Sequence, residues 1–331
     1  MRITYAPWGE TLGELTEAAG AAQDAGAEVI WLPELHRSAT VSAAAVAAAT
    51  SGAGVGSAIA LAFTRSPMIT ALEALDLDEL TGGRFVLGLG SGARRLNENW
   101  HNADWERPLV RLRETVEVIR MIIATAHTGE PLRYEGETQR LDIRGFRRPY
   151  PPVRERIPIY LAAVGPQLTR LAGRIGDGWI SHELASPAYL REHVLPNLEP
   201  GPGFDVVVSG CCSIADDPAV ARREAAGVLG FYASVATYKD FFAFHGLAEE
   251  HAAVVSAFRS GVAAAELARA VPERMIDPLV LAGTPDQVAG RIAAYEGLAT
   301  TIKLSPAVYG NAPDVIRACQ ARVIALIKEL T

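Results

Sequence analysis

Short β-branched segments alternate with helical segments along almost the whole chain, and this alternation restricts the fold more than any other feature. Eight segments have the length and composition of buried strands: residues 2–6 (RITYA), 28–33 (EVIWLP), 54–62 (GVGSAIALA), 84–90 (RFVLGLG), 158–163 (PIYLAA), 177–181 (DGWIS), 204–214 (FDVVVSGCCSI) and 300–305 (TTIKLS). Helical patterns follow these strands. Eight strands, each with a following helix, predict an α/β fold, a (β/α)8 barrel around a parallel sheet.

The helices and interruptions complete this outline. Proline and glycine mark the two ends of a helix over residues 67–80, and helices are also expected over residues 108–125 and 313–330. The polar sequence ARRLNENWHNADWERP predicts no helix before about residue 106. Residues 132–143 predict a hairpin. Residues 217–283 are mostly helical and longer than one crossover needs, so we expect a helical insertion after the seventh strand. Without a linker or repeat, residues 1–331 are expected to form a single domain.

Composition excludes several classes of protein. Hydrophobic residues make up 49% of the 331 residues, and 31 basic and 38 acidic residues give a net charge of -7 without charged blocks. A nucleic-acid partner would require a basic face, so none is expected. No apolar run approaches the roughly 20 residues of a membrane span, and residues 1–10 show no signal-peptide pattern. Cys211, Cys212 and Cys319 form no C-x-x-C motif. These features favour a reduced, cytoplasmic protein.

Two glycine-containing turns follow predicted strands. Residues 84–95 (RFVLGLGSGARR) satisfy a loose G-x-G-x-x-A pattern. A dinucleotide fingerprint would open a helix at once and place an acid at the next strand end about 20 residues later, and neither feature is expected here. In a barrel, such a turn lies at the active-site face, where backbone N–H groups bind oxyanions. Val164, Gly165 and Pro166 form a second such turn. The pair favours a phosphate-bearing ligand, and ordinary tight turns are the alternative.

The residues that other classes of barrel enzyme require are missing from this sequence. The first strand ends in YAPWG, without the H-x-H of a metal hydrolase, and no metal-ligand spacing occurs elsewhere, so no metal is expected. A G-x-S-x-G nucleophile elbow is missing. Lys303 is the one lysine on a predicted strand. A Schiff-base reaction at Lys303 is a remote alternative, and a contact between Lys303 and a phosphate is another.

Three segments resemble a known family. Residues 56–92 and 157–179 are similar to the bacterial-luciferase-like monooxygenase superfamily, and residues 231–246 to an actinobacterial group within it that uses coenzyme F420, a deazaflavin. The likeness extends over about residues 3–326. It implies a luciferase-like barrel that binds F420 in preference to FMN.

The resemblance also implies a cofactor site. Family members carry a non-proline cis peptide behind the deazaflavin ring, and the matching bond here is Ser57–Ala58. Residues expected to bind the ring are Ser57, Ala58 and Ala60; those expected to bind the tail are Gly90, Ser91, Gly92, Ala93, Ala163, Val164, Gly165 and Pro166.

Residues 31–39 (WLPELHRSA) occupy the position where family members carry an acid followed by one or two histidines. Glu34 matches the acid, His36 matches the second histidine, and Leu35 replaces the first. We therefore expect Glu34 or His36 to act as the acid–base group, with water as the alternative proton donor. The structural alternatives are that His36 holds the loop and that Glu34 pairs with Arg37 or Arg65.

Two aromatic residues are expected to contact substrate: Trp8 after the first strand and Tyr232 in the insertion. The alternatives are that Trp8 packs in the core and that Tyr232 packs along a helix.

The resemblance predicts an F420-dependent oxidoreductase. Reduced F420 would transfer a hydride from C5 to a C=C, C=N or C=O carbon of a small molecule or modified peptide, as a reductase of secondary metabolism. An FMN-dependent monooxygenase and a non-catalytic deazaflavin-binding protein are the alternatives. Because the family commonly dimerises, a homodimer is expected, and the alanine-rich residues 41–50 are compatible with it.

Overall fold

The computed structural model describes residues 1–184 and 186–331. The chain divides into two compact units. Unit 1 comprises Met1–Ile30, Ser181–Pro196 and Val206–Thr331, and unit 2 comprises Trp31–Ile180 and Asn197–Asp205. The single domain stays a prediction.

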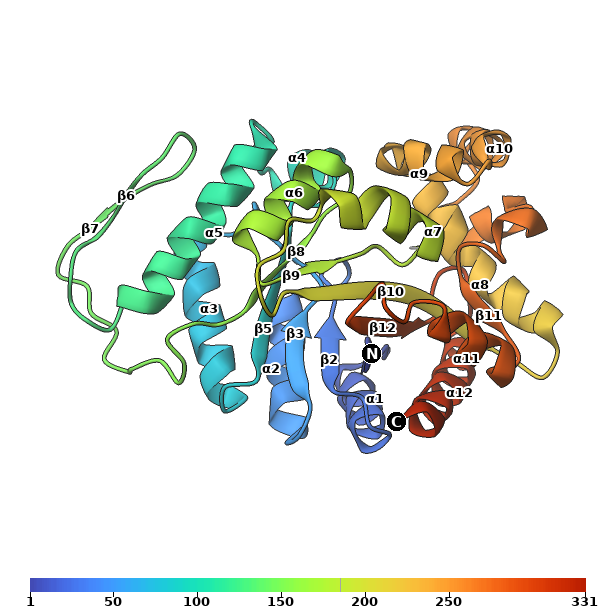
Figure 1. The fold of residues 1–331 in the computed structure, drawn as a ribbon, viewed down its shortest axis with the longest axis horizontal. Helices are drawn as coiled ribbons and strands as arrows, with labels where there is room; N and C mark the ends of the chain where they lie inside the picture. The colour runs from blue at the N-terminus through green and yellow to red at the C-terminus, as the bar shows by residue number, and fades with distance from the viewer. Residues whose placement is uncertain (185) are drawn as a thin grey trace. The chain divides into compact units, whose positions relative to one another are not determined.

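Eight parallel strands form a closed barrel, as predicted, in the order β1-β2-β3-β5-β8-β9-β10-β12, and β12 pairs again with β1 (Figure 1). β4 also pairs with β5, and β11 pairs with β10. The strands are β1 (Arg2–Tyr5), β2 (Val29–Leu32), β3 (Gly54–Ser57), β4 (Ala60–Leu61), β5 (Phe85–Gly90), β8 (Ile159–Ala162), β9 (Gly178–Ile180), β10 (Asp205–Ile214), β11 (Leu281–Gly283) and β12 (Thr301–Pro306). β6 (Leu132–Glu135) and β7 (Arg140–Ile143) form the predicted hairpin.

Helices follow the strands, with capping residues at many of their starts. Side chains of Thr11, Ser38 and Ser66 accept N–H groups at the starts of α1, α2 and α3, and proline occupies the first turn of several helices. The α-helices are α1 (Leu12–Asp24), α2 (Ala39–Ala49), α3 (Pro67–Leu80), α4 (Arg94–His101), α5 (Pro108–Thr125), α6 (Pro166–Ile175), α7 (Pro187–Tyr189), α8 (Pro218–Ala233), α9 (Lys239–Phe244), α10 (Ala248–Arg259), α11 (Pro285–Ala293) and α12 (Pro313–Leu330).

Two elements differ from the predictions. The segment predicted to lack a helix before about residue 106 contains α4, which begins at Arg94, directly after the glycine loop. Its polar composition reflects exposure on most sides, while buried Asn97 attaches it to the loop. The predicted insertion contains α8, α9 and α10, but it ends in β11. This three-residue strand carries too little pattern to be recognised, and its register against β10 defines it.

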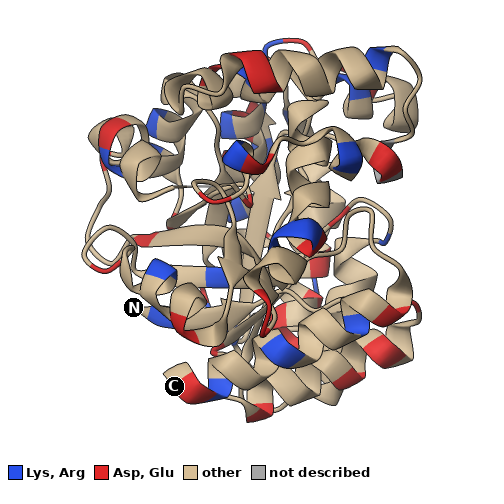
Figure 2. Cartoon of the chain, turned by 90° about the vertical axis from the view of Figure 1, so that its right-hand side faces the viewer, with Lys and Arg blue, Asp and Glu red and all other residues tan. Residues whose placement is uncertain are grey.

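Basic and acidic residues are interspersed along the helices, as the colours in Figure 2 show. This distribution follows the mixed charge pattern of the sequence. None of the helices in the described part of the chain is long and apolar enough to cross a membrane.

Candidate functional site

β3 and β5 approach each other unusually closely in unit 2. The Ser57 hydroxyl donates to the Gly88 carbonyl at 2.8 Å and accepts the Gly88 N–H at 2.9 Å. A Cβ at Gly88 would lie 1.9 Å from the Ser57 carbonyl oxygen. Only glycine fits at position 88. Its backbone N–H and carbonyl bond to the Ser57 side chain in place of a backbone partner on β3.

A cis peptide bond follows β3, and it joins Ala58 to Ile59. The prediction of Ser57–Ala58 was therefore wrong by one residue. Ser57 is instead fixed by Gly88, and the Ala58 N–H bonds to the Leu32 carbonyl at 2.9 Å, so the chain departs from the strand only after Ala58. Ala60 resumes pairing with β5, opposite Leu89.

The first glycine loop connects β5 directly to α4. Gly90 packs against Ile59, and Gly92 has φ +67°, which favours glycine. Asn97, fully buried, donates its amide to the carbonyls of Ser91 at 2.7 Å and Ala93 at 3.0 Å. Ala93 is the N-cap of α4, and no side chain of a described residue caps this helix. Its first N–H groups are therefore available to a ligand.

The second loop connects β8 to α6 in the same way. Gly165 is the N-cap, with φ +81°, and Pro166 begins the helix without a side-chain cap from a described residue. No described atom lies within 4 Å of the place where a Gly165 Cβ would be. The preceding Ala163 is fixed, because its carbonyl accepts the Trp179 indole N–H at 3.1 Å, while Val164 is half-buried.

The two loops belong to neighbouring strands of one unit. Leu89 of β5 pairs with Leu161 of β8 in parallel, so both loops leave from the same end of the sheet. Two uncapped helix N-termini at this end bring together N–H groups and the positive ends of two helix dipoles. This arrangement is suited to an anion such as a phosphate.

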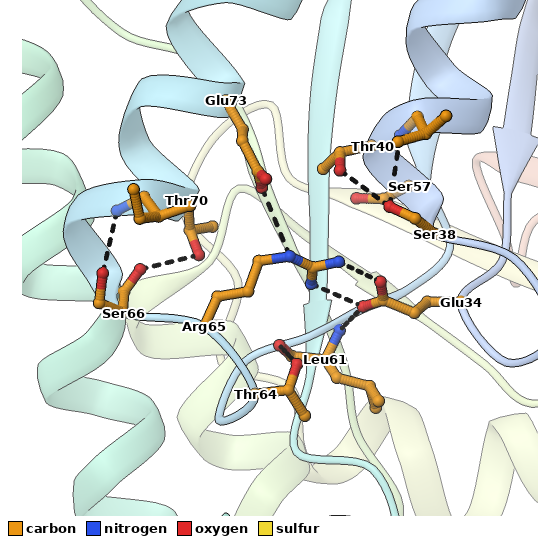
Figure 3. Close-up of polar contacts among 12 residues, drawn as sticks. Glu34, Ser38, Thr40, Ser57, Leu61, Thr64, Arg65, Ser66, Thr70 and Glu73 are labelled. Carbon is orange, nitrogen blue, oxygen red and sulfur yellow. Dashed lines mark hydrogen bonds and ion pairs between the residues drawn. The ribbon is translucent and has the colours of Figure 1, made fainter. Parts of the chain in front are cut away.

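Glu34 lies in an ion pair, which Figure 3 shows. Arg65 donates Nη1 to Oε2 at 2.8 Å and also bonds Oε1 through Nη2, and the Leu61 N–H donates to Oε2 at 2.8 Å. Burial acts to raise the pKa of Glu34, but Arg65 and the Leu61 N–H outweigh it, so the net pKa is lowered. The structure thus contains the Arg65 pairing that the sequence left open.

Glu73 lies on the other side of the same guanidinium. Its Oε2 is 3.6 Å from Arg65 Nε, and burial raises the pKa of Glu73. The Arg65 guanidinium therefore lies between two carboxyl groups. The pKa of Glu34 is lowered and the pKa of Glu73 is raised, so the two groups differ in proton affinity. Leu35 is half-buried and His36 is exposed next to this group.

Trp8 and Tyr232, the expected substrate residues, belong to unit 1. The Trp8 backbone N–H donates to the side-chain oxygen of Gln320 at 2.8 Å, and the Gln320 amide nitrogen donates to the Trp8 carbonyl at 3.2 Å. Trp8 therefore packs on α12. The Tyr232 hydroxyl accepts the Glu183 N–H at 3.4 Å, and its ring lies 5.7 Å from that of His182. Binding of substrate by these two residues stays a prediction.

Sequence reasoning missed a second polar group in unit 1. Glu183 follows β9, and Ser305 on β12 donates to its Oε1 at 2.7 Å, with Lys303 close by. Lys303 stands out in the sequence as the one lysine on a predicted strand, but Glu183 carries no motif. Its position two residues beyond the predicted sixth strand was the one available signal. No group of three or more possible metal ligands occurs among residues 1–184 and 186–331.

A parallel (β/α)8 barrel with two uncapped helix starts at one end of the sheet has the architecture of TIM-barrel enzymes, whose active sites lie at the ends of the strands. The family model for luciferase-like monooxygenases matches residues 2–301, and the chain belongs to this family.

Three relatives illustrate the family. The chain is 30% identical to the 5,10-methylenetetrahydromethanopterin reductase of Archaeoglobus fulgidus, over 82% of each chain. It is 27% identical, over 90% of this chain and 91% of the relative, to Rv3520c of Mycobacterium tuberculosis, whose name assigns it provisionally to the coenzyme F420-dependent oxidoreductases. The coenzyme F420-dependent tetrahydromethanopterin reductase of Methanopyrus kandleri has a TM-score of 0.81 at 23% identity, over 99% of this chain and 97% of the other. The resemblance to F420-dependent oxidoreductases of this family is confirmed.

Proposed function

We propose that this protein is an F420-dependent oxidoreductase that works as a reductase. The observation that carries the proposal is the pair of uncapped helix starts, α4 after β5 and α6 after β8, on neighbouring strands. The F420 dependence named for Rv3520c and for the similar structure from Methanopyrus kandleri supports the choice of cofactor.

The residues of unit 2 fit a deazaflavin with an acidic tail. The N–H groups after Ala93 and Gly165 would hold the tail, and the open space at Gly165 leaves room for a phosphate. Ala58, half-buried, would lie beside the ring, and the buried residues Ser57 and Ala60 would support it from behind. Bound F420 supplies a hydride at C5 to a C=C, C=N or C=O carbon of the substrate.

The protein residues then position the reactants. The Glu34–Arg65 pair fixes Leu61, three residues beyond Ala58, and so holds the turn behind the ring. With its pKa lowered, Glu34 is a poor proton donor, and we assign it a positioning role. His36, exposed on the same loop, is the acid–base candidate of this unit.

The physiological setting is part of the proposal. Leu35 in place of the family histidine and the long helical insertion support a specialised substrate, a small unsaturated metabolite or modified peptide of secondary metabolism. The buried thiols Cys211, Cys212 and Cys319 support a reducing, cytoplasmic location.

We also propose a homodimer that buries α2 and α3. These helices pack on each other, and each carries an exposed apolar side chain, Val41 at 57% and Ile69 at 48% exposure. Analytical ultracentrifugation of the wild type and of V41E/I69E tests this. A dimer that becomes a monomer in the variant is expected, and a monomeric wild type would contradict it.

Fluorescence titration of the apoprotein with oxidised F420, and separately with FMN, tests the cofactor. We expect tight binding of F420 and weak binding of FMN. A preference for FMN would favour an oxygen-using monooxygenase. Binding of F420 without turnover of any unsaturated substrate would favour the non-catalytic protein, and binding of neither would refute the phosphate site.

A further inference from the structure

Asn97 is the one buried residue of α4, the helix that follows the first glycine loop, and it is fully buried. Its amide nitrogen Nδ2 donates to the Ser91 carbonyl at 2.7 Å and to the Ala93 carbonyl at 3.0 Å. Its Oδ1 is buried as well and accepts no hydrogen bond from a described residue. A buried amide oxygen without a partner destabilises a folded chain. Stability alone therefore gives no reason for an asparagine at this position.

Gly92 lies between the two carbonyls that Asn97 binds. Its φ of +67° is a conformation that glycine adopts readily, and a Cβ at this position would lie 3.3 Å from Asn97 Nδ2. The turn at Gly92 brings the carbonyls of Ser91 and Ala93 to the same amide nitrogen. One side chain thus joins the loop to the first turn of α4.

The direction of these two carbonyls also fixes the direction of two N–H groups. The peptide bonds of this loop are trans, and in a planar trans peptide the N–H points opposite to the C=O. The Ser91 and Ala93 carbonyls point to Asn97. The N–H groups of the residues that follow them, Gly92 and Arg94, therefore point away from it. Neither N–H group bonds to another described residue.

We propose that Asn97 is a positioning residue of the cofactor site, which turns the N–H groups of Gly92 and Arg94 outwards to bind the tail phosphate of F420. This assignment rests on the proposed function and names the residue that prepares the first glycine loop for an anion. Backbone N–H groups and the positive end of a helix dipole both stabilise a bound oxyanion. Without the Asn97 donor, the Ser91 carbonyl is free to turn towards the anion, which it would repel.

Position 97 requires an uncharged donor. The asparagine amide has two hydrogens, enough for the two carbonyls. A carboxylate has none, and it would add a negative charge beside a bound anion. Leucine has a similar size and no polar group. The unpartnered Oδ1 follows from this requirement, because an amide group that donates here also brings its oxygen into the interior.

The first experiment observes the two N–H groups directly. Apoprotein labelled with ¹⁵N is titrated with inorganic phosphate and, separately, with sodium chloride at equal ionic strength. We expect phosphate, and not chloride, to shift the amide signals of Gly92 and Arg94. The variant N97L should bind phosphate about 10-fold more weakly or worse, the value of one lost charged hydrogen bond. Equal affinities in wild type and N97L, or no shift in the wild type, would overturn the proposal.

The second experiment separates the phosphate from the ring. Fluorescence titration compares F420 with the phosphate-free deazaflavin alcohol, which keeps the ring and the sugar-alcohol chain. N97L should lower the affinity for F420 about 10-fold or more and change the affinity for the alcohol by less than about 2-fold. A merely structural asparagine would affect both ligands alike, and that result would overturn the proposal.

Asn311 in unit 1 provides a matched control. Its amide nitrogen also donates to two carbonyls, those of Glu224 at 2.8 Å and Ala307 at 3.0 Å. N311L therefore removes the same kind of contact, and thermal unfolding should show a comparable loss of stability. Its F420 affinity should equal that of the wild type. An equal loss of F420 affinity in N311L and N97L would show that affinity follows stability, against the proposal.

The variant N97D tests the donor without removing the polar group, and it replaces N97L if leucine prevents folding. A protonated carboxyl can donate one hydrogen bond to the Ser91 carbonyl, and burial favours the protonated form. The F420 affinity of N97D relative to wild type should therefore rise as the pH falls from about 8 to about 5. A ratio that does not change with pH would contradict the proposal.

The two proposals fail differently. Wild type that binds FMN in preference to F420 refutes the proposed function, while the phosphate titration still reports on Asn97. Wild type and N97L that bind F420 equally tightly leave the proposed function in place and overturn the role of Asn97.

Discussion

The Glu114 carboxylate on α5 accepts both the backbone N–H and the hydroxyl of Thr138, each at 2.7 Å. The N–H groups of Glu137 at 2.8 Å and Gln139 at 3.0 Å bond the same carboxylate. One buried acid thus binds the turn between β6 and β7 and attaches the hairpin to α5.

Substitution E114Q should release this hairpin. A neutral amide cannot accept all of these donors, and leaving them unpaired costs about 1–3 kcal/mol. Hydrogen exchange should show faster exchange at residues 137–139, with the barrel amides unchanged. Protection equal to the wild type would show that other contacts hold the hairpin.

The Glu114 carboxylate should also make the stability of the protein depend on pH. Burial opposes ionisation, but the N–H groups of Glu137, Thr138 and Gln139 lower the pKa of Glu114 to about 2 from an ordinary 4.5. Its contribution to stability is therefore complete above about pH 4.5 and disappears as the pH falls towards 2. Urea midpoints of wild type and E114Q should differ at pH 7 and converge near pH 2. A constant difference would contradict this.

Substitution G165A should weaken cofactor binding. A Cβ at Gly165 would enter the open space in front of α6, and φ +81° strains an alanine by about 1 kcal/mol or more. Gly145, with φ +73° and equally open surroundings, is the matched control in the same unit. G165A and G145A should lose similar stability by thermal unfolding. Only G165A should lower F420 affinity; equal affinities would remove Gly165 from the tail site.

Substitution E34Q should loosen the turn that carries the cis peptide. An amide cannot form the bidentate ion pair with Arg65, and the guanidinium would keep Glu73 as its remaining acid. We expect F420 affinity to fall several-fold and stability to fall by about 1–3 kcal/mol. If Glu34 were instead the proton donor, E34Q would bind F420 normally and lose kcat. Titration and steady-state kinetics separate these outcomes.

Two histidines should make unit 1 sensitive to acid. Burial, assisted by neighbouring histidines, lowers the pKa of His182 to about 3 and of His245 to about 4. Because both are neutral in the folded state, the unfolded chain binds more protons below pH 6.5. Stability should therefore fall as the pH decreases from 6.5 towards 4, by up to about 1.4 kcal/mol per pH unit for each histidine.

Urea midpoints of H182Q/H245Q across this range check the prediction. The double variant should lose most of the slope. H36Q, which changes an exposed histidine, is the control and should keep it. A wild-type slope in the double variant would place the acid sensitivity elsewhere.

The sequence by itself determined the barrel. The eight predicted strands are all present, and the helices Pro67–Leu80, Pro108–Thr125 and Pro313–Leu330 have the predicted bounds. These elements are long and periodic, and proline, glycine and apolar spacing define them locally. The glycine turns could be found for the same reason, because Gly92 and Gly165 adopt backbone conformations that other residues avoid.

The tertiary structure decided what depends on contacts between distant segments. The cis bond lies at Ala58–Ile59, one residue beyond Ser57, whose hydroxyl bonds to Gly88, 31 positions away. The polar helix α4 is held by one buried amide, and β11 exists only through its pairing with β10. The pairing of Glu34 with Arg65 and the approach of Glu183 to Lys303 join residues 31 and 120 positions apart. No local pattern encodes such distances, since they arise only when the strands close into a barrel.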